Sequence, residues 1–152
     1  IENLPHSTVM MGVPTYYTRL LADPGFSAKS CECIRLFISG SAPLLKDTFV
    51  EFQQRTGHII LERYGMTETG MNTSNPLHGD RRPGTVGLPL PGVEVRICSD
   101  DNRALGPDQV GVMQVRGNNV FAGYWNMPDK TSEDFTPDGF FIRTRNFLCH
   151  AF

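Results

Sequence analysis

The sequence predicts an α/β fold, with a partial parallel sheet and crossover helices over about residues 1–70 and a β-rich segment of a small barrel or sheet after it. Two observations lead to this fold class. Strand-like and helix-like patterns alternate through residues 8–62, and period-two patterns separated by turns dominate the second half. The length of 152 residues suffices for one domain with a sizeable core.

The first half contains five expected elements. In order they are a strand at Thr8–Val13, a helix at Pro14–Ala22, a strand at Ile34–Ser39, a helix that begins at Ser41–Pro43 and ends at Gly57, and a strand at Ile59–Glu62. Proline suits the first turn of a helix, and glycine commonly follows the last turn. The second helix is expected to turn four side chains inward, namely Leu44, Leu45, Phe49 and Phe52. This alternation predicts parallel strands joined by right-handed crossovers.

The ends of these three strands are the expected place for a binding site. In a parallel sheet, ligands bind beyond the carboxyl ends of the strands. The segments at those ends are rich in glycine, proline and hydroxyl side chains, and they are Gly12–Thr15, Ser39–Pro43 and Arg63–Glu68. We therefore expect the three segments to meet on one rim of the sheet.

The second half is expected to be a long connection followed by short strands. Residues 71–92 are predicted to form a loop because four prolines interrupt them. The elements expected after it are a strand at Val93–Ile97, a turn at Ser99–Asn102, an antiparallel strand at Val110–Val115 that ends at Gly117, a short helix at Thr131–Phe135, and a turn at Asp138–Gly139 before Phe140–Ile142. Such a pattern is typical of an antiparallel sheet or a small barrel.

Charge and composition exclude several classes of protein. The net charge of −2, from 14 basic and 16 acidic residues, leaves no basic surface for nucleic acid. No apolar run approaches the ~20 residues of a membrane span, so no membrane partner is expected. Cys31 and Cys33 could offer two thiolates to a metal, but no second pair stands at a matching spacing, so reduced structural thiols are favoured. The sequence does not determine the oligomeric state.

The segment Arg63–Thr69 carries side chains that suit a nucleotide. The ring of Tyr64 can stack on a flat base, and Gly65 permits close approach of the backbone. The hydroxyl of Thr67 can donate to a phosphate oxygen, and Glu68 can hold a Mg²⁺ ion that bridges phosphates. The alternative is an ordinary exit from a strand, with one buried tyrosine and polar groups at the surface.

Several segments together resemble the acyl-adenylate-forming synthetases, a family that includes acyl-CoA ligases, peptide-synthetase adenylation domains and luciferases. The segments that carry the resemblance are Tyr64–Thr69, Ser39–Leu44, Gly117–Trp125 and Asp138–Phe141, and the likeness covers residues 1–142. Within that family the malonyl-CoA synthetases are the most similar, through Gly12–Leu20, Glu62–Thr69 and Met71–Pro76. The chain is therefore expected to be part of the large domain of an adenylating enzyme.

The resemblance implies an acid–thiol ligase with ATP, Mg²⁺ and coenzyme A. Such an enzyme joins malonate to AMP, releases pyrophosphate, and then transfers the malonyl group to coenzyme A. The resemblance implies that Ser41, Ala42 and Pro43 border the adenine and acyl pocket, and that Tyr64 stacks on adenine beside Gly65 and Met66. It implies that Thr67 meets the α-phosphate and that Glu68 binds Mg²⁺. It also implies that Arg19, Arg63 and Ser41 hold the far carboxylate of malonate.

The two arginines also have a physical argument of their own. Malonate keeps one negative charge when its other end is activated, and burying that charge without a partner costs several kcal/mol. The planar guanidinium fork matches a carboxylate, so Arg19 and Arg63 suit this task. The alternative for Arg19 is a solvated cation on a helix surface.

The sequence departs from the family pattern in three places. The family's phosphate loop and its C-terminal domain with the adenylation lysine are missing, and Arg143–Asn146 stand where the family has Thr-Gly-Asp. We therefore expect a partial AMP-binding domain at residues 1–142 and a tail at residues 143–152, from a frameshift or truncation, that packs poorly. The chain alone is expected to be inactive.

Two other functions stay open. One is a ligase for a different short acid, and the other is a nucleotide-binding remnant without catalytic activity. The expected compartment is the cytoplasm, or the mitochondrial matrix in a eukaryote.

Overall fold

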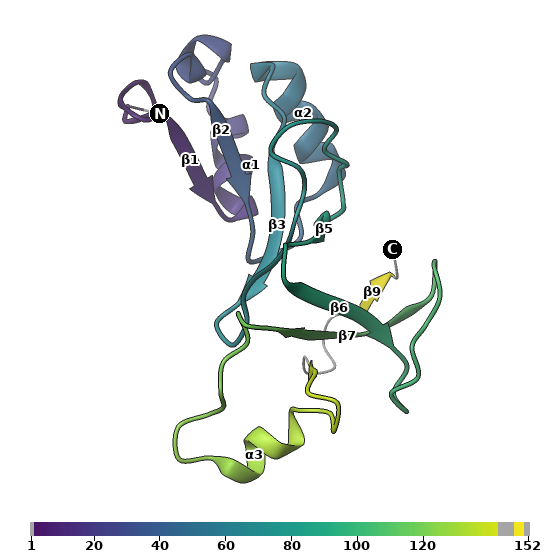
Figure 1. Cartoon of the computed structure of the whole chain (residues 1–152). Helices are drawn as coiled ribbons and strands as arrows, with labels where there is room; N and C mark the ends of the chain where they lie inside the picture. Colours follow the sequence, from purple (N-terminus) through teal and green to yellow (C-terminus); the bar gives the residue numbers. More distant parts are fainter. Residues whose placement is uncertain (1, 143–147, 151–152) are drawn as a thin grey trace. The chain divides into compact units, whose positions relative to one another are not determined.

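The computed structural model describes residues 2–142 and 148–150, and the chain divides into two compact units. The first unit comprises residues 1–65 and 73–88, and the second comprises residues 66–72 and 89–152. Through the first unit the chain forms a 3-10 helix at Leu4–His6, β1 at Val9–Gly12, α1 at Pro14–Ala22, a 3-10 helix at Ala28–Cys31, β2 at Leu36–Ser39, α2 at Lys46–Thr56 and β3 at Leu61–Met66 (Figure 1). The later elements are β4 at Gly70–Ser74, β5 at Leu88–Pro89, β6 at Val93–Cys98, β7 at Val110–Gly117, α3 at Pro128–Glu133, β8 at Phe141–Ile142 and β9 at Leu148–His150.

A parallel sheet forms the centre of the first unit, as predicted. Strands β1 and β2 pair in parallel with Gly12 opposite Ser39, and β2 and β3 pair in parallel with Ser39 opposite Glu62. The strand order in this sheet is β1-β2-β3-β4-β5. The predicted crossover arrangement of residues 8–62 is thus confirmed.

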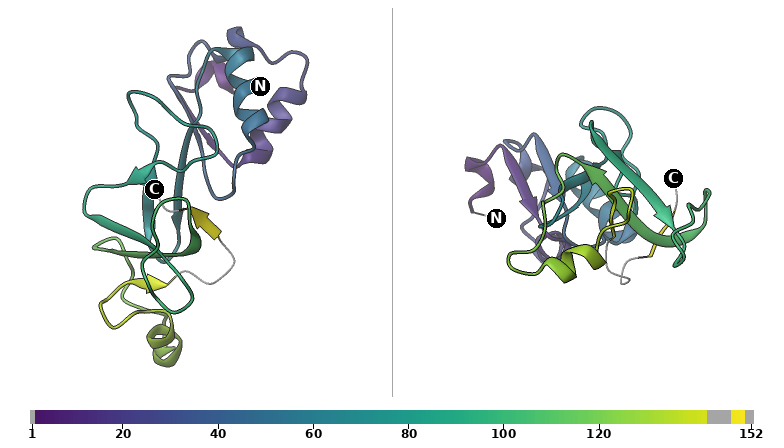
Figure 2. Two further views of the ribbon diagram at one scale, coloured as in Figure 1. Left: turned by 90° about the vertical axis from the view of Figure 1, so that its right-hand side faces the viewer. Right: turned by 60° about the horizontal axis from the view of Figure 1, so that its bottom comes forward.

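Helices α1 and α2 cover one face of the parallel strands (Figure 2, left). Two successive right-handed crossovers in the same direction place both helices on the same face. The ring of Phe52 lies at the centre of this core, edge-on to Tyr17 of α1 at 5.4 Å and to Phe37 of β2 at 4.9 Å between centroids. The hydroxyl of Tyr17 donates to the carbonyl of Ile38 at 2.6 Å, which satisfies the one polar group of this buried side chain.

Helix α2 begins later than the sequence predicts. Ser41 adopts a left-handed backbone with φ of 67°, and Leu45 is extended, so the first helical residue is Lys46. Leu45 is consequently 69% exposed, against the prediction that it faces inward, whereas Leu44, Phe49 and Phe52 are buried. The end of the helix is as predicted, because Gly57 takes the left-handed conformation that terminates it.

The stretch predicted as a loop after residue 70 contains two strands. Strand β3 continues to Met66, beyond the predicted end at Glu62, and the turn Thr67–Thr69 leads directly into β4. A connection of three residues between adjacent strands is a hairpin, which extends the parallel sheet by β4. Strand β5 then lies beside β4, where Leu90 N–H donates to the carbonyl of Asn72 at 2.9 Å.

The second unit is built on the antiparallel pair β6 and β7, which the sequence predicts. Val93 lies opposite Gly117 and Cys98 lies opposite Val112. Strand β8 pairs with the other edge of β7 at Gln114 and Val115. In the described part of the chain the two sheets are open, so of the two predicted forms the sheet is found and no barrel closes. Helix α3 begins three residues before the predicted helix at Thr131–Phe135 and overlaps its first three residues.

The tail prediction is only partly within the described residues. Residues 143–147 and 151–152 lie outside them. The backbone of Leu148–His150 forms β9 and pairs with Val110–Val112 of β7, whereas the sequence predicts a tail that packs poorly. This pairing has a physical reason. The part of β7 that β8 does not cover presents backbone N–H and C=O groups, and such groups can pair with another strand whatever its side-chain pattern.

Candidate functional site

The carboxyl ends of β1 and β2 lie level with one another, because Gly12 is opposite Ser39. The backbone and stem of Arg63 lie directly beside Gly40, where an added Cβ would be 3.3 Å from the Arg63 carbonyl and 3.7 Å from its Cγ. Gly40 therefore leaves room for the arginine stem to pass over the end of β2. These contacts confirm that the strand ends of the first unit come together.

Arg63 reaches across to the first strand of the sheet. Its Nη2 donates to the sulfur of Met11 at 2.6 Å, although β2 separates β1 from β3. Within the described part of the chain, no carboxylate forms an ion pair with Arg63 or with Arg19. Among the residues that the structure describes, the two arginines are therefore cations without an ion-paired counter-charge.

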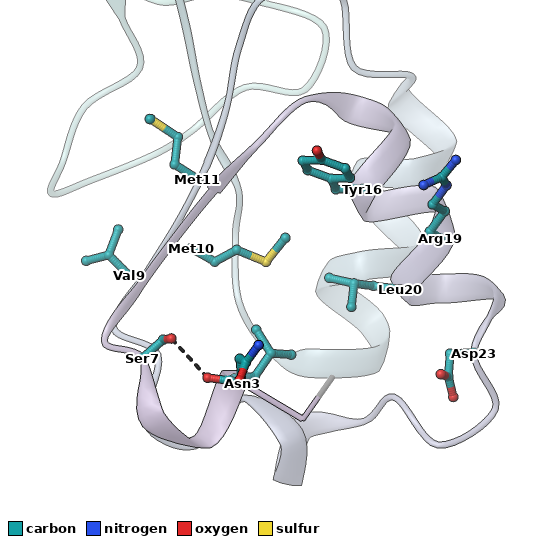
Figure 3. Close-up of a pocket in the computed structure, with 10 residues that line it drawn as sticks. Asn3, Ser7, Val9, Met10, Met11, Tyr16, Arg19, Leu20 and Asp23 are labelled. Carbon is teal, nitrogen blue, oxygen red and sulfur yellow. Dashed lines mark hydrogen bonds between the residues drawn. The ribbon is translucent and has the colours of Figure 1, made fainter.

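Arg19 lines a cavity of about 530 Å³ between β1 and α1 (Figure 3). Met10, Tyr16 and Leu20 form much of its apolar wall, and Met11 also belongs to its lining. In Figure 3 Tyr16 and Arg19 project from α1, while Met11 extends from β1 away from that helix. Met11 thus contacts Arg63 and belongs to the lining of the cavity that Arg19 also lines, and the described contacts do not join the two guanidinium groups.

The loop Ser41–Pro43 is exposed and follows β2 directly. A buried carboxylate fixes the chain next to it, since Glu62 accepts hydrogen bonds from the backbone N–H groups of Leu44 and Gly84. Burial raises the pKa of Glu62, and the two N–H donors partly oppose that rise. Glu62 was not among the predicted site residues, and its position next to Arg63 in the signature segment is the signal that could have identified it.

The signature segment itself begins in a strand. Tyr64 belongs to β3 and is 9% exposed, so most of its surface is already covered. Gly65 ends the first compact unit and Met66 begins the second. The adenine-side residues and the phosphate-side residues of the predicted site thus belong to different units of the structure.

In the second unit, the turn Thr67–Thr69 presents its side chains in three different environments. Thr67 is exposed, Glu68 is half-buried and Thr69 is completely buried. The carbonyl of Glu68 accepts a hydrogen bond from Phe121 N–H at 2.7 Å, and the hydroxyl of Thr69 accepts one from Asn72 Nδ2 at 2.8 Å. The turn is therefore fixed through its backbone and through Thr69, while the side chain of Thr67 stays exposed.

The carboxylate of Glu68 has one described protein neighbour, the phenol of Tyr124, whose hydroxyl donates to Oε1 at 3.4 Å. Burial raises the pKa of Tyr124 to about 12, and the charge of Glu68 adds to the rise. Mg²⁺ in nucleotide sites commonly uses one or two carboxylates, with water and phosphate oxygens completing its octahedron. A single half-buried carboxylate therefore fits a Mg²⁺ ion that arrives with a nucleotide.

A second motif of the predicted family lies at the turn before β8. Asp138 forms an ion pair with Arg96 at 2.7 Å, and this hydrogen bond lowers the pKa of Asp138 to about 2. The guanidinium groups of Arg96 and Arg116 lie over the ring of Phe140 at 3.8 and 4.4 Å. These contacts give the motif Asp138–Phe141 a structural role in the second unit.

Among residues 2–142 and 148–150, no group of three or more histidine, cysteine, aspartate or glutamate side chains could hold a metal ion. None of the helices in the same residues has the length and apolar character needed to span a bilayer.

Comparison with known families decides the relationship that the motifs predict. The model of the AMP-binding enzyme family matches residues 5–125. The chain belongs to the AMP-binding enzyme family. The match includes Ser41–Pro43 and Tyr64–Thr69, so the predicted adenine-side loop and signature lie inside the family's region.

Curated relatives from this family are similar over most of the chain. A malonate–CoA ligase from Arabidopsis thaliana is 46% identical over 144 residues, which cover 88% of this chain and 23% of the relative. A mitochondrial malonate–CoA ligase from Mus musculus is 42% identical over 167 residues, which cover 90% of this chain and 29% of the relative. The chain thus spans about a quarter of the length of the curated relatives it matches.

Solved structures agree with this assignment. ATP-bound MatB from Rhodopseudomonas palustris superposes with a TM-score of 0.90 at 54% identity, covering 93% of this chain and 28% of that chain. A malonyl-CoA ligase in complex with methylmalonyl-CoA and AMP gives a TM-score of 0.78 at 48% identity, covering 90% of this chain and 30% of that chain. The predicted recognition and fold class are both confirmed.

Proposed function

We infer that this chain is part of an AMP-forming acid–thiol ligase that activates malonate. The observation that carries this proposal is the pair Arg19 and Arg63, which have no ion-pair partner in the described residues. Arg63 is a half-buried residue within β3, and Arg19 is an exposed residue of α1. A ligase for a neutral acid would gain nothing from such charges, because uncompensated cations near an apolar acyl chain are costly. The names of the relatives support the same substrate.

The adenine side of the substrate ATP is assigned to the first unit. In this proposal Ser41, Ala42 and Pro43 border the adenine and acyl groups, and Tyr64 stacks on the base. The exposed backbone of Ser41–Pro43 supports the first role. The stem of Arg63 passes beside Gly40, which brings a cation close to this loop and supports a carboxylate of the substrate there, with Ser41 as an added donor.

The phosphate side is assigned to the turn Thr67–Thr69. The exposed hydroxyl of Thr67 donates to an α-phosphate oxygen, and the carboxylate of Glu68 holds Mg²⁺. When bound, Mg²⁺ neutralises phosphate charge that develops as pyrophosphate leaves. The backbone hydrogen bond from Phe121 to Glu68 keeps the turn in place while these side chains act.

The proposed reaction has two steps. A carboxylate oxygen of malonate bonds to the α-phosphorus of ATP, and the bond to the bridging oxygen breaks, so pyrophosphate leaves with the electron pair. The thiolate of coenzyme A then bonds to the acyl carbon, and AMP leaves with the oxygen. Arg19 and Arg63 hold the unreacted carboxylate through both steps, which keeps the reacting carboxylate at the phosphorus. We place this chemistry in the cytoplasm or the mitochondrial matrix.

A graft tests the proposal with the residues of this chain. Residues 5–142 replace the equivalent segment of MatB from Rhodopseudomonas palustris, and AMP formation is measured with malonate, acetate and propionate. We expect malonate to be preferred. In the graft, Arg63→Met is expected to lower kcat/KM for malonate by about 10- to 100-fold, because a charge-assisted hydrogen bond contributes roughly 1.5–3 kcal/mol.

Arg35→Met is the matched control for this experiment. Arg35 is an exposed arginine just before β2, at the opposite end of that strand from Ser39 and Gly40. We expect this variant to keep the malonate activity of the graft. Equal activity of the graft with malonate and with propionate, or equal losses in both arginine variants, would contradict the assignment of malonate.

A further inference from the structure

The half-buried side chain of Asn119 is the centre of a hydrogen-bond network in the second unit. Its Nδ2 donates to the carbonyl of Thr69 at 2.6 Å and to Oδ1 of Asn72 at 3.1 Å, and it lies 3.5 Å from the carbonyl of Met71. Asn72 and Thr69 are both completely buried. One amide from the segment after β7 therefore serves acceptors on three residues about 50 positions earlier in the chain.

The surroundings of Asn119 leave no substitute for this donor. Gly117 is packed against its Oδ1 so closely that a Cβ there would overlap it, and Oδ1 itself is buried without a described partner. Asn72 uses its own Nδ2 to donate to the hydroxyl of Thr69. The two acceptors Thr69 O and Asn72 Oδ1 thus depend on the Asn119 amide.

The same segment binds the turn a second time. Two residues further on, Phe121 N–H donates to the carbonyl of Glu68 at 2.7 Å. The successive carbonyls of Glu68 and Thr69 therefore accept hydrogen bonds from one short piece of chain, Asn119–Phe121. The side chains of Thr67 and Glu68 stand on the backbone that these bonds fix.

We propose that Asn119 is a positioning residue that holds the turn Thr67–Thr69 in the geometry needed for phosphate transfer. This inference rests on the proposed function, since it takes the roles of Thr67 and Glu68 from there. Asn119 touches neither substrate nor metal. Its effect passes through the backbone of the turn and through Asn72.

Replacement of Asn119 by aspartate is the sharpest probe of this role. Aspartate has the same shape, but the ionised carboxylate donates no hydrogen bond and faces the carbonyl of Thr69 and Oδ1 of Asn72. The neighbour Asn118 is exposed, so Asn118→Asp adds the same charge one residue away without entering the network. The two variants differ only in whether the lost amide was a donor to the turn.

The first measurement is amide hydrogen exchange by NMR, in the 152-residue chain and in the graft described above. In Asn119→Asp we expect the Phe121 amide to exchange about 10- to 100-fold faster, since a lost hydrogen bond with a buried, unpaired acceptor costs roughly 1–3 kcal/mol. The amides of β6 and β7 are expected to keep their rates. Asn118→Asp is expected to leave the Phe121 amide unchanged.

The second measurement separates positioning from binding in the graft. Asn119→Asp is expected to lower kcat for malonyl-AMP formation by about 10-fold or more while KM for malonate stays within about 3-fold. The loss should shrink as pH falls, because a protonated carboxyl regains one O–H donor. Asn118→Asp should keep both constants.

The outcomes are distinguishable. An unchanged Phe121 amide in Asn119→Asp, or equal acceleration at β6 and β7, would overturn the positioning role. A graft with unaltered residues that forms no malonyl-AMP would contradict the proposed function, and the exchange rates would still decide whether Asn119 holds the turn.

Discussion

At the scale of the single residue, Glu62 is the side chain next to the candidate site with the largest electrostatic consequence. Its carboxylate is 5% exposed and accepts N–H groups from Leu44 and Gly84, which follow two different strands. Asn75 fixes the same region, because its Nδ2 donates to the carbonyls of Glu62 at 3.1 Å and Thr85 at 2.7 Å. The loop before α2 and the loop after β4 thus meet at one buried acid.

Glu62→Gln is expected to remove a pH dependence of stability. Burial raises the pKa of Glu62 in the folded state above its ordinary value of 4.5, so the folded state binds the proton more tightly than the unfolded state. The free energy of unfolding of the unaltered chain should therefore rise relative to Glu62→Gln as pH falls from 7 toward 4.5. Urea unfolding of both proteins measures this difference, and a constant difference over that range would contradict the prediction.

At the scale of the element, two glycines with the same backbone conformation have different reasons to be glycine. Gly57 after α2 and Gly87 before β5 both have φ of 74°. A Cβ on Gly57 would meet nothing within 4 Å, whereas a Cβ on Gly87 would overlap the backbone of Ser74. The first position requires only a left-handed backbone, and the second also requires the absence of a side chain.

The pair gives a matched prediction. Gly57→Ala is expected to lower the free energy of unfolding by about 1–2 kcal/mol, the cost of a left-handed residue with a Cβ. Gly87→Ala is expected to cost more, because the loop 75–87 must also move away from β4. Chemical denaturation of the two variants measures both costs, and equal values would show that the contact with Ser74 carries no energy.

The elements that sequence patterns predicted correctly are those whose signals are local. Pro14 opens α1 and Gly57 closes α2, because each residue restricts its own backbone. The predicted start of α2 was wrong because Ser41 takes a left-handed backbone conformation, which its residue type does not indicate. Asn119 and Asn72 were missed because their partners are fixed by tertiary contacts and leave no periodic pattern.

For the predicted site, the structure shows where the strand-end segments lie, while the roles of the site residues stay predictions. The segments around Gly12, Ser39 and Arg63 were predicted to come together, and the contacts among them are present. The clamp of Arg19 and Arg63 on malonate stays a prediction, and the described contacts place Arg63 against Met11 and Arg19 in the lining of the cavity. The direction of a long side chain depends on its neighbours, here Met11 and Gly40, which a sequence motif does not specify.

At the scale of the whole molecule, this chain corresponds to about a quarter of the length of its curated relatives. The described residues contain the predicted adenine-side loop and the signature turn, and both lie within the part of the chain that the AMP-binding family model matches.

The 152-residue chain by itself is expected to form no malonyl-AMP. These residues span about a quarter of the length of the relatives, and the turn Thr67–Thr69 alone is expected to supply only part of the electrostatic stabilisation that such a transfer requires. Pyrophosphate release with ATP, Mg²⁺ and malonate measures this, with the graft as the positive control. Malonate-dependent release above a protein-free control would contradict the expectation.

The parallel pairing of β1 with β2 also sets a delay during synthesis of the chain. Val9 pairs with Leu36, 27 positions later, so β1 leaves the ribosome before its partner strand does. At roughly 5–20 residues per second, β1 waits about 1–5 s without a neighbouring strand. Helix α1 is made during that interval, and Figure 3 shows Met10 turned toward it. Helix α1 can therefore pack against one face of β1 before the sheet begins to form.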